Sequence, residues 1–294
     1  MSYNICIVKP KNNPHSDAFW EMAELLAYSL RDLNQDTSIC INEILGNRQN
    51  ILLGAHLLTD TNNLPLSTII INTEEMRFGL SDIDELETEK LKWVERIVSL
   101  GKEHLIWDYS DDNIEFLNSK GCLKIKKFEF GFHEKLNRIS QQKHKDIDVL
   151  FYGALTKRRN KLLIQLTEAG LKVKSLFGVY GAQRDEYISR AKIVLNCHHY
   201  DTKDFEIVRV HYLLNNAVTV ISEIDPETKI EPFWKDVIFG VTYDEITQVC
   251  VNLAKNELER TKISELAFSK FKKRPQKDFT AKLIEHKNSY IDLS

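Results

Sequence analysis

The chain has 294 residues, with 40 lysines and arginines against 43 aspartates and glutamates, and its formal net charge is -3. This length suits one large domain or two domains of roughly 100–200 residues, and either arrangement can bury a sizeable core. The slightly acidic balance provides no overall positive field, which argues against DNA or an anionic membrane as the main partner.

Hydropathy and cysteine usage predict a cytoplasmic location. No apolar run approaches the roughly 20 residues that span a bilayer, and the first residues lack the pattern of a signal peptide. The five cysteines are scattered and form no CxxC pair, so neither a disulfide framework nor a redox motif is indicated. The sequence leaves a peripheral membrane association open.

The first half of the chain alternates short apolar runs, typical of strands, with amphipathic patterns, typical of helices. Strand-like runs cover residues 3–9, 37–44, 49–58, 66–74, 103–110 and 122–132. Helical patterns cover residues 17–33, 85–101 and 113–121, and Gly101 marks the predicted end of the second. Residues 133–148 are polar and charged, which predicts a domain linker.

The same alternation restarts at Val149. Strand-like runs cover residues 149–153, 172–178, 192–200, 217–223 and 234–243. Helical patterns cover residues 157–170, 183–191 and 205–216, and the tail continues with helices over residues 243–254 and 262–273.

Strands that alternate with helices imply parallel sheets covered by helices on both faces. Two such blocks predict an α/β protein with two Rossmann-like domains facing a cleft, residues 1–142 and 146–294. Helices after Asp244 are expected to pack back toward the first domain. Ligands of such sheets bind at the carboxyl ends of the strands, so the polar residues directly after each strand are the candidates for a site.

A run of three cations, Lys157, Arg158 and Arg159, begins the helix that follows the strand ending at Gly153. A helix N-terminus carries partial positive charge, so cations are unfavourable there unless an anion neutralises them. Phosphate is the natural anion because arginine pairs with it in a bidentate manner. The alternative is that the three side chains point into solvent. The chain has neither GxGxxG after a strand nor a GxxxxGK motif, which argues against a classical dinucleotide site and a P-loop.

Residues 148–223 resemble the C-terminal half of GT-B glycosyltransferases, through DVLFYGALTKRR, FGVYG and FEIVRVHYLL. The likeness is clearest to bacterial glycosyltransferase-like proteins that share the strand–glycine–RR turn, FGVYG and FExxRxxYLL. It extends more weakly to the first half through GAHLL, INTEEM, WDYSDDNI and FEFGF. The resemblance implies a glycosyltransferase of EC class 2.4 whose C-terminal domain binds a nucleotide-sugar donor and whose N-terminal domain binds the acceptor.

The donor-binding residues that the resemblance implies are Gly153, Lys157, Arg158, Arg159, Phe177, Tyr180, Glu206, Arg209 and His211. By this resemblance the glycine and the three cations would face the diphosphate, and the two aromatic residues would lie near the base. The last three begin a helix beneath the ribose and the sugar.

The last segment departs from the family pattern. Many retaining members carry two glutamates eight positions apart, but His211 stands where the second would be, and Glu206 is offset from the first. The carboxylate contact to the ribose is therefore unassigned. Glu206 and Arg209 are also helix neighbours that can form a plain ion pair, and the apolar surroundings of His211 are equally typical of a core histidine.

An inverting glycosyltransferase also needs a base at the acceptor. The candidates in the first half are His15, Glu74 and Asp108, because each follows a predicted strand or precedes a helix. Each can instead be structural. Ser16, next to His15, is a good N-cap, and the two carboxylates can cap helices or form ion pairs.

No cofactor and no metal ion are predicted. The triplets Asp82–Asp84 and Asp146–Asp148 resemble a metal-binding motif of another glycosyltransferase fold, but they stand in a polar loop and before a strand. Cys197–His199 could suggest a metal, yet three ligands from one short segment do not converge, and a structural role is expected.

The sequence thus predicts a metal-independent transfer of sugar from a nucleotide-sugar donor, with the leaving diphosphate stabilised by Lys/Arg and a helix N-terminus. The acceptor is open between a glycan, a protein and a small molecule. One alternative is a non-catalytic nucleotide-sugar-binding or scaffold protein. Another is a DNA-modifying glucosyltransferase, against which the net charge argues.

Overall fold

The computed structural model describes residues 1–11, 13–77, 85–199 and 204–285. These residues form two compact units. The first comprises Met1–Phe130 together with the C-terminal segment that begins at Gln276, and the second comprises Gly131–Pro275. Each unit is an α/β layer structure built on a parallel sheet, which confirms the predicted fold class.

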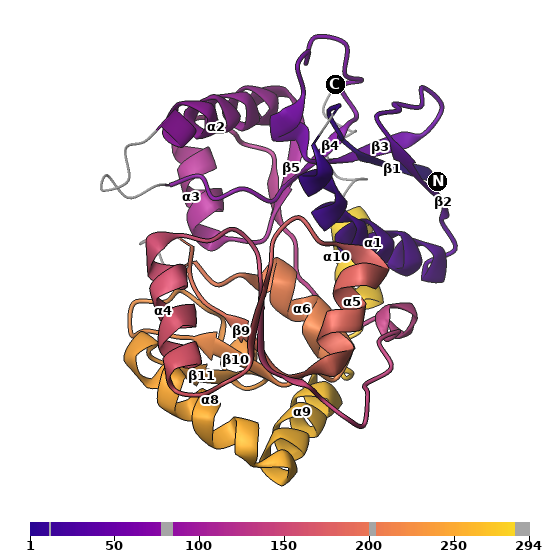
Figure 1. Ribbon diagram of the computed structural model, residues 1–294. Helices are drawn as coiled ribbons and strands as arrows, with labels where there is room; N and C mark the ends of the chain where they lie inside the picture. Colours follow the sequence, from indigo (N-terminus) through magenta and orange to yellow (C-terminus); the bar gives the residue numbers. More distant parts are fainter. Residues whose placement is uncertain (12, 78–84, 200–203, 286–294) are drawn as a thin grey trace. The chain divides into compact units, whose positions relative to one another are not determined.

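The first unit contains a six-stranded parallel sheet with the order β2-β1-β3-β4-β5-β6 (Figure 1). Its strands are β1 (Ser2–Ile7), β2 (Asp36–Ile41), β3 (Gln49–Leu53), β4 (Ile69–Asn72), β5 (Leu105–Asp108) and β6 (Ile125–Lys127). Its α-helices are α1 (Trp20–Asp32), α2 (Glu85–Glu103), α3 (Asp111–Ser119) and α10 (Gln276–Glu285). Two short 3-10 helices, η1 (Pro14–Phe19) and η2 (Ala55–Leu57), follow β1 and β3.

Alternating side chains cover the two faces of this sheet. Cys6, Leu52, Ile70 and Ile106 stand on four neighbouring strands and join one apolar cluster with residues of α2 and α3. Helix α1 packs along β1 and β2, and α10 lies beside α1 (Figure 1). Helix α10, the last helix of the described residues, therefore belongs to the first unit, whereas α8 and α9, also predicted to pack there, belong to the second.

The second unit contains a five-stranded parallel sheet with the order β11-β10-β9-β7-β8. Its strands are β7 (Ile147–Tyr152), β8 (Val173–Leu176), β9 (Ala191–Asn196), β10 (Val220–Glu223) and β11 (Phe239–Val241). Its α-helices are α4 (Lys157–Glu168), α5 (Gly181–Arg190), α6 (Ile207–Asn215), α7 (Pro232–Lys235), α8 (Ile246–Lys255) and α9 (Glu257–Phe271). The 3-10 helices η3 (Glu134–Leu136) and η4 (Tyr243–Glu245) lie at its start and before α8.

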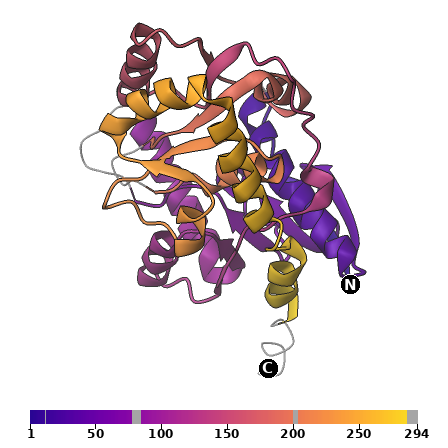
Figure 2. The same cartoon turned by 90° about the horizontal axis from the view of Figure 1, so that it is seen from below.

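The main core of this unit lies between the sheet and helices α4 and α8. Val149, Phe151, Ile193, Leu195 and Ile221 are buried there. Helices α5 and α6 pack against strands of the same sheet, and α9 contacts both α6 and α8. The turned view shows α8 and α9 in front of the strands (Figure 2).

Residues 133–148, predicted as a linker, lie within the second unit and are bound to it. The side-chain amide of Asn215 accepts the N–H of His133 at 3.0 Å, and that of Asn216 accepts the N–H groups of Arg138 and Ile139 at 2.8 Å each. Two asparagines at the end of α6 thus fix the entry of the chain into the second unit.

Two predicted elements differ from the structure. The apolar run 234–243 forms the short helix α7 and then β11, because Pro232 starts a helical turn that buries Trp234. Gly101 does not end α2, which continues to Glu103. None of the helices in the described part of the chain combines the length and apolar character that crossing a bilayer requires.

Gly101 is buried inside α2, and we predict that this close packing makes it irreplaceable. A Cβ atom built there would lie 2.5 Å from Ile106 Cδ1 and 2.7 Å from Cys122 Sγ. Gly101→Ala should therefore lower the free energy of unfolding by roughly 1–3 kcal/mol, the usual cost of overpacking. Urea unfolding of the variant and the wild type measures this difference in the free energy of unfolding. Gly46→Ala is the control, because apart from Gly46 and its two chain neighbours no atom of the described residues lies within 4 Å of that Cβ position. Equal stability of the two variants would contradict the prediction.

Candidate functional site

The candidate site lies where the parallel strands of the second sheet end. Strands β7, β8, β9 and β10 all deliver their carboxyl ends to one edge, and each is followed by a turn that carries polar residues. Gly153 directly follows β7 with φ of 135°. This positive φ favours glycine, and the guanidinium of Arg209 lies close to the backbone here, with Nη2 2.9 Å from where a Cβ atom would stand.

Helix α4 begins four residues after Gly153. Thr156 is its N-cap and accepts the N–H of Arg159 at 3.2 Å. Lys157 is exposed on the first turn. The two arginines that follow it turn toward the sheet, each to a different carboxylate.

Arg158 forms a bidentate pair with Glu223, the last residue of β10. Its Nη1 donates to Glu223 Oε2 at 2.6 Å, and its Nη2 donates to Oε1. The side chain of Glu223 has no exposed surface, whereas that of Arg158 is 32% exposed. The guanidinium also lies 3.9 Å from the ring centre of Tyr243.

Arg159 is buried, and all three of its side-chain nitrogens donate hydrogen bonds. The acceptors among the described residues are the carbonyl oxygens of Ala154, Cys197 and His198, the Nδ1 atom of His199 and the carboxylate of Glu206. Arg159 therefore ties the turn after β7 to the turn after β9.

These two pairs add a third outcome to the two that the sequence left open for the cations at the start of α4. A bound phosphate was expected to neutralise them, with solvent as the alternative. In the structure Glu223 neutralises Arg158 and Glu206 neutralises Arg159. The chain supplies these anions itself, and the first turn of α4 adds the exposed cation of Lys157.

Glu206 is the residue before α6, and it joins several groups of the edge. Its Oε1 is 3.1 Å from Arg159 Nη2, and its Oε2 accepts Asn196 Nδ2 at 3.0 Å and lies 3.3 Å from His198 Nδ1. Burial raises the pKa of Glu206, but the hydrogen bond and charge of His198 and the charges of Arg209 and Arg159 outweigh it and lower that pKa to about 2. Burial lowers the pKa of His198, but the carboxylate of Glu206 more than offsets this and raises it. Glu206 is therefore ionised at neutral pH.

Arg209 is half-buried on the first turn of α6. Its Nη1 donates to Asn196 Oδ1 at 2.6 Å, and its guanidinium lies 5.4 Å from the ring centre of Tyr152. The guanidinium of the buried Arg184 lies 5.6 Å from the same ring. Two cations thus stand beside the aromatic residue that ends β7.

The remaining predicted donor residues separate into two groups. Phe177 and Tyr180 lie in the turn between β8 and α5, where Phe177 is 60% exposed and Tyr180 precedes the helix. His211 has no exposed surface, and its Nδ1 lies 3.3 Å from the carbonyl oxygen of Ile207 within α6. His211 is a core histidine, the structural alternative that the sequence left open.

The three candidate bases of the first unit have different surroundings. Asp108 is fully buried, and its carboxylate accepts the side-chain amides of Asn72 and Asn113 and the N–H of Ser110. Glu74 follows β4 with a side chain 30% exposed, and its Oε1 lies 3.5 Å from Nε2 of the buried His56.

His15, the third candidate, is exposed on η1, and its N–H donates to Asn13 Oδ1 at 3.0 Å. Asn13, not Ser16, provides the cap of that helix. The predicted helix-capping role of Ser16 is therefore wrong.

Two groups bear on metal binding. Both aspartates of the triplet Asp146–Asp148 form ion pairs with side chains of the protein. Asp146 pairs with Arg190, and Asp148 pairs with Lys192. The other triplet, Asp82–Asp84, lies outside the described residues. His198, Glu223 and Asp225 offer ligand atoms that all lie within 4.8 Å of one another.

Sequence reasoning missed Glu223 and Asn196 and gave His198 no function. Each stands at the end of an apolar run, VTVISE or KIVLNCHH. A polar residue directly after a buried parallel strand was the available signal. The partners of these residues on α4 could not be identified without the strand order β10-β9-β7, in which β9 lies between β10 and β7.

The relatives that match the chain in sequence are of viral origin. Two uncharacterized proteins of Acanthamoeba polyphaga mimivirus are 28% identical over 181 residues and 25% identical over 187 residues. These matches cover 58% and 62% of this chain and 59% and 63% of the relatives, so the chain spans about three fifths of their length. No protein-family model matches the chain.

Solved structures that resemble the chain include T4 phage BGT with UDP and Mn²⁺, with a TM-score of 0.60 and 12% identity over 100% of both chains. The DNA-modifying enzyme β-glucosyltransferase has a TM-score of 0.57 and 11% identity, and the match covers 97% of this chain and 99% of that one. Anabaena HepE with UDP-glucose gives 0.57 and 12%, with the same coverage. The chain therefore has the GT-B glycosyltransferase fold, and at these identities the likeness concerns the fold alone.

We predict that the Arg158–Glu223 pair holds the strand edge together. Arg158→Ala leaves a fully buried carboxylate without its cation. The free energy of unfolding should therefore decrease by about 3 kcal/mol, the lower end of the roughly 3–5 kcal/mol lost when a buried pair loses one partner. The lower end applies because Arg158 reaches solvent. The double variant Arg158→Met with Glu223→Gln should recover part of the loss in urea unfolding. A double variant less stable than Arg158→Ala would contradict this role.

We also predict that His211 sets part of the acid sensitivity. Burial lowers its pKa from 6.5 to about 4. As pH falls below 6.5 the unfolded chain binds a proton at His211, while the folded chain does so only near pH 4, so the folded state loses stability across that window. His211→Gln should flatten the dependence of melting temperature on pH between 6.5 and 4. The exposed His144, changed to Gln, is the control. Equal slopes in the wild type and His211→Gln would refute this.

Proposed function

We propose that this chain is a glycosyltransferase in which the second unit binds the diphosphate of a nucleotide-sugar donor and the first unit binds the acceptor. The GT-B fold supports the class of reaction, and the carboxyl ends of the strands are where such sheets bind ligands. The observation that carries the proposal is a group of cations at this edge, formed by Arg209 against Gly153 and by Lys157 and Arg158 at the start of α4.

These cations suit a leaving diphosphate. Lys157 is exposed and needs no rearrangement to contact a phosphate. Arg158 keeps a partly exposed guanidinium while bound to Glu223, and the free N–H groups of the first turn of α4 add partial positive charge. Charge that develops on the leaving diphosphate would be stabilised by these fixed groups without a metal.

Arg159 has a different role in this proposal from the one that the resemblance implied. Its nitrogens all donate to atoms of the protein, so it positions the turns after β7 and β9 rather than binding the donor. Glu206 is held in the same network, and its ionised carboxylate lies beside the start of α6. A carboxylate at this place is suited to accept hydrogen bonds from ribose hydroxyls.

On the acceptor side, Glu74 is the candidate base that the geometry favours. It follows β4, its side chain is partly exposed, and the imidazole of His56 lies beside one of its oxygens. Asp108 is less suited because three donors already occupy its buried carboxylate. A base must reach the proton that it removes from the acceptor.

The test begins with nucleotide binding. Uridine, guanosine, adenosine and cytidine diphosphates and their sugars are added separately, and a ligand that binds only the folded chain raises the melting temperature. With the best ligand, Lys157→Ala should weaken affinity roughly ten- to a hundredfold, because a charge-assisted contact contributes roughly 1.5–3 kcal/mol. Lys161→Ala, one turn further along the exposed side of α4, should leave affinity unchanged.

Two results would overturn the proposal. One is the absence of any nucleotide diphosphate that stabilises the chain. The other is equal affinity in Lys157→Ala, Lys161→Ala and the wild type. Binding without sugar transfer or donor hydrolysis would instead support the non-catalytic nucleotide-sugar-binding alternative. DNA can be included among the acceptors tested, although the net charge gives it no support.

A further inference from the structure

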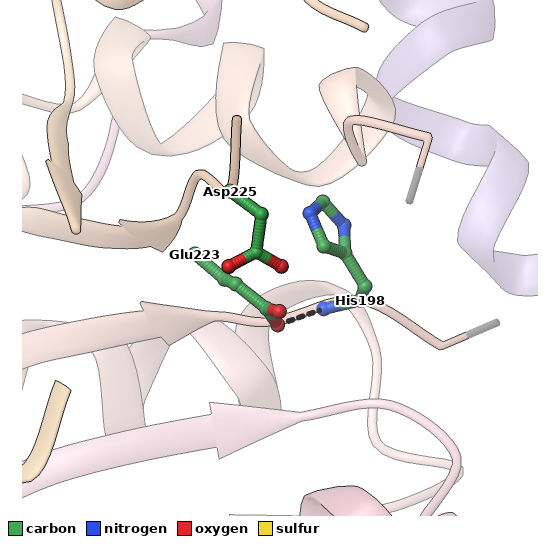
Figure 3. Close-up of side chains that lie close together, drawn as sticks. All are labelled: His198, Glu223 and Asp225. Atoms are coloured by element: carbon green, nitrogen blue, oxygen red, sulfur yellow. Dashed lines mark hydrogen bonds between the residues drawn. The ribbon is translucent and has the colours of Figure 1, made fainter. Parts of the chain in front are cut away.

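We propose that His198, Glu223 and Asp225 bind a divalent transition-metal ion. The three side chains come from neighbouring parallel strands, β9 and β10, whose register pairs Asn196 with Ser222. His198 stands two residues beyond the end of β9, Glu223 ends β10, and Asp225 follows two residues later. Figure 3 shows the two carboxylates and the imidazole facing one another.

The orientation of His198 is the first argument. Its Nδ1 lies 3.1 Å from the carbonyl oxygen of Asp204 and 3.3 Å from Glu206 Oε2, and both are acceptors. Nδ1 therefore carries a proton, and Nε2 is the nitrogen left to coordinate an ion. A histidine ligand whose other nitrogen donates to a carboxylate or a backbone carbonyl is the usual arrangement at protein metal sites.

The surroundings of Nε2 allow an ion to replace its present partner. Thr228 Oγ1 lies 3.1 Å from Nε2 and also accepts the N–H of Asp225 at 2.9 Å. A hydroxyl can rotate its proton away, so its oxygen can turn a lone pair toward an ion. Thr228 is itself buried, which places a further oxygen beside the three ligand atoms.

The capacity of Glu223 is the third argument. Each carboxylate oxygen has about two acceptor positions. Oε2 accepts Arg158 Nη1 and the N–H of His198, and Oε1 accepts Arg158 Nη2. Among the described residues these bonds leave one acceptor position on Oε1. Glu223 can therefore contact an ion without releasing Arg158.

The ligand set determines which ion is expected. Carboxylate oxygens alone would suit Mg²⁺, Ca²⁺ or Mn²⁺, whereas an added imidazole nitrogen shifts the preference toward transition metals such as Zn²⁺. Zn²⁺ should bind more tightly than Mn²⁺, following the general affinity order of the divalent transition metals. Mg²⁺ should bind more weakly than Mn²⁺, because it is a hard cation that prefers oxygen ligands to the imidazole nitrogen. This inference is independent of the proposed transferase activity, because the ion is measured in the absence of nucleotide.

The experiment uses the full chain after treatment with a chelator, with Mn²⁺ alone as the probe and no nucleotide present. Electron paramagnetic resonance of free Mn²⁺ gives the dissociation constant. We expect Mn²⁺ to saturate one site. Zn²⁺ should displace Mn²⁺ from that site at a lower concentration than Mg²⁺ does. Asp225→Asn, an isosteric change at a partly exposed position, should weaken Mn²⁺ binding at least tenfold.

Glu227→Gln is the matched control, because it removes one carboxylate from the same turn at an exposed position outside the cluster. It should bind Mn²⁺ like the wild type. His198→Gln should also weaken binding, with its melting temperature measured to confirm a folded chain. The proposal is wrong if neither Mn²⁺ nor Zn²⁺ saturates a site, if Asp225→Asn and Glu227→Gln bind equally, or if Mg²⁺ binds as tightly as Mn²⁺.

Discussion

The strand edge of the second unit depends on the neutralisation of two carboxylates, Glu223 at the end of β10, whose side chain has no exposed surface, and Glu206 before α6, whose side chain is 19% exposed. An uncompensated buried charge costs several kcal/mol, so Glu223 in particular requires a cation. Arg158 and Arg159, consecutive on α4, provide the two countercharges. This pairing fixes the start of α4 relative to strands that lie on the far side of β7 in the sheet. Because this pairing fixes the start of α4, it also sets the position of Lys157 and of the turn at Gly153.

A consequence is that neighbouring arginines have unequal roles. Arg159 is enclosed by carbonyl oxygens and a carboxylate, so its charge is used entirely within the protein. Arg158 meets its carboxylate from the solvent side. Successive residues of a helix point about 100° apart, which is why a run of three cations divides into one that is exposed, one that is intermediate and one that is buried.

The sequence was sufficient to predict the α/β class, two parallel sheets and the edge at which polar residues gather, because periodicity and turn residues are local properties. The partners of the polar residues were not accessible in that way. The Arg158–Glu223 pair spans 65 positions, and it depends on the strand order β10-β9-β7. The role of Asn215 and Asn216 was missed for the same reason, since their amides bind backbone that comes some 80 residues earlier. His211 was left undecided because a helical position alone does not say which face is buried.

The return of α10 to the first unit affects how the chain can fold during synthesis. Ser29 on α1 hydrogen-bonds Thr280 on α10 at 2.8 Å across 251 positions of sequence. Lys126 Nζ donates to the carbonyl oxygen of Leu283, and Gln276 Nε2 to that of Glu129. When the second unit leaves the ribosome, the first still lacks the helix that covers α1. Its packing therefore waits until α10 has been synthesised, and until then the uncovered side of α1 is a surface to which chaperones or a second nascent chain can bind.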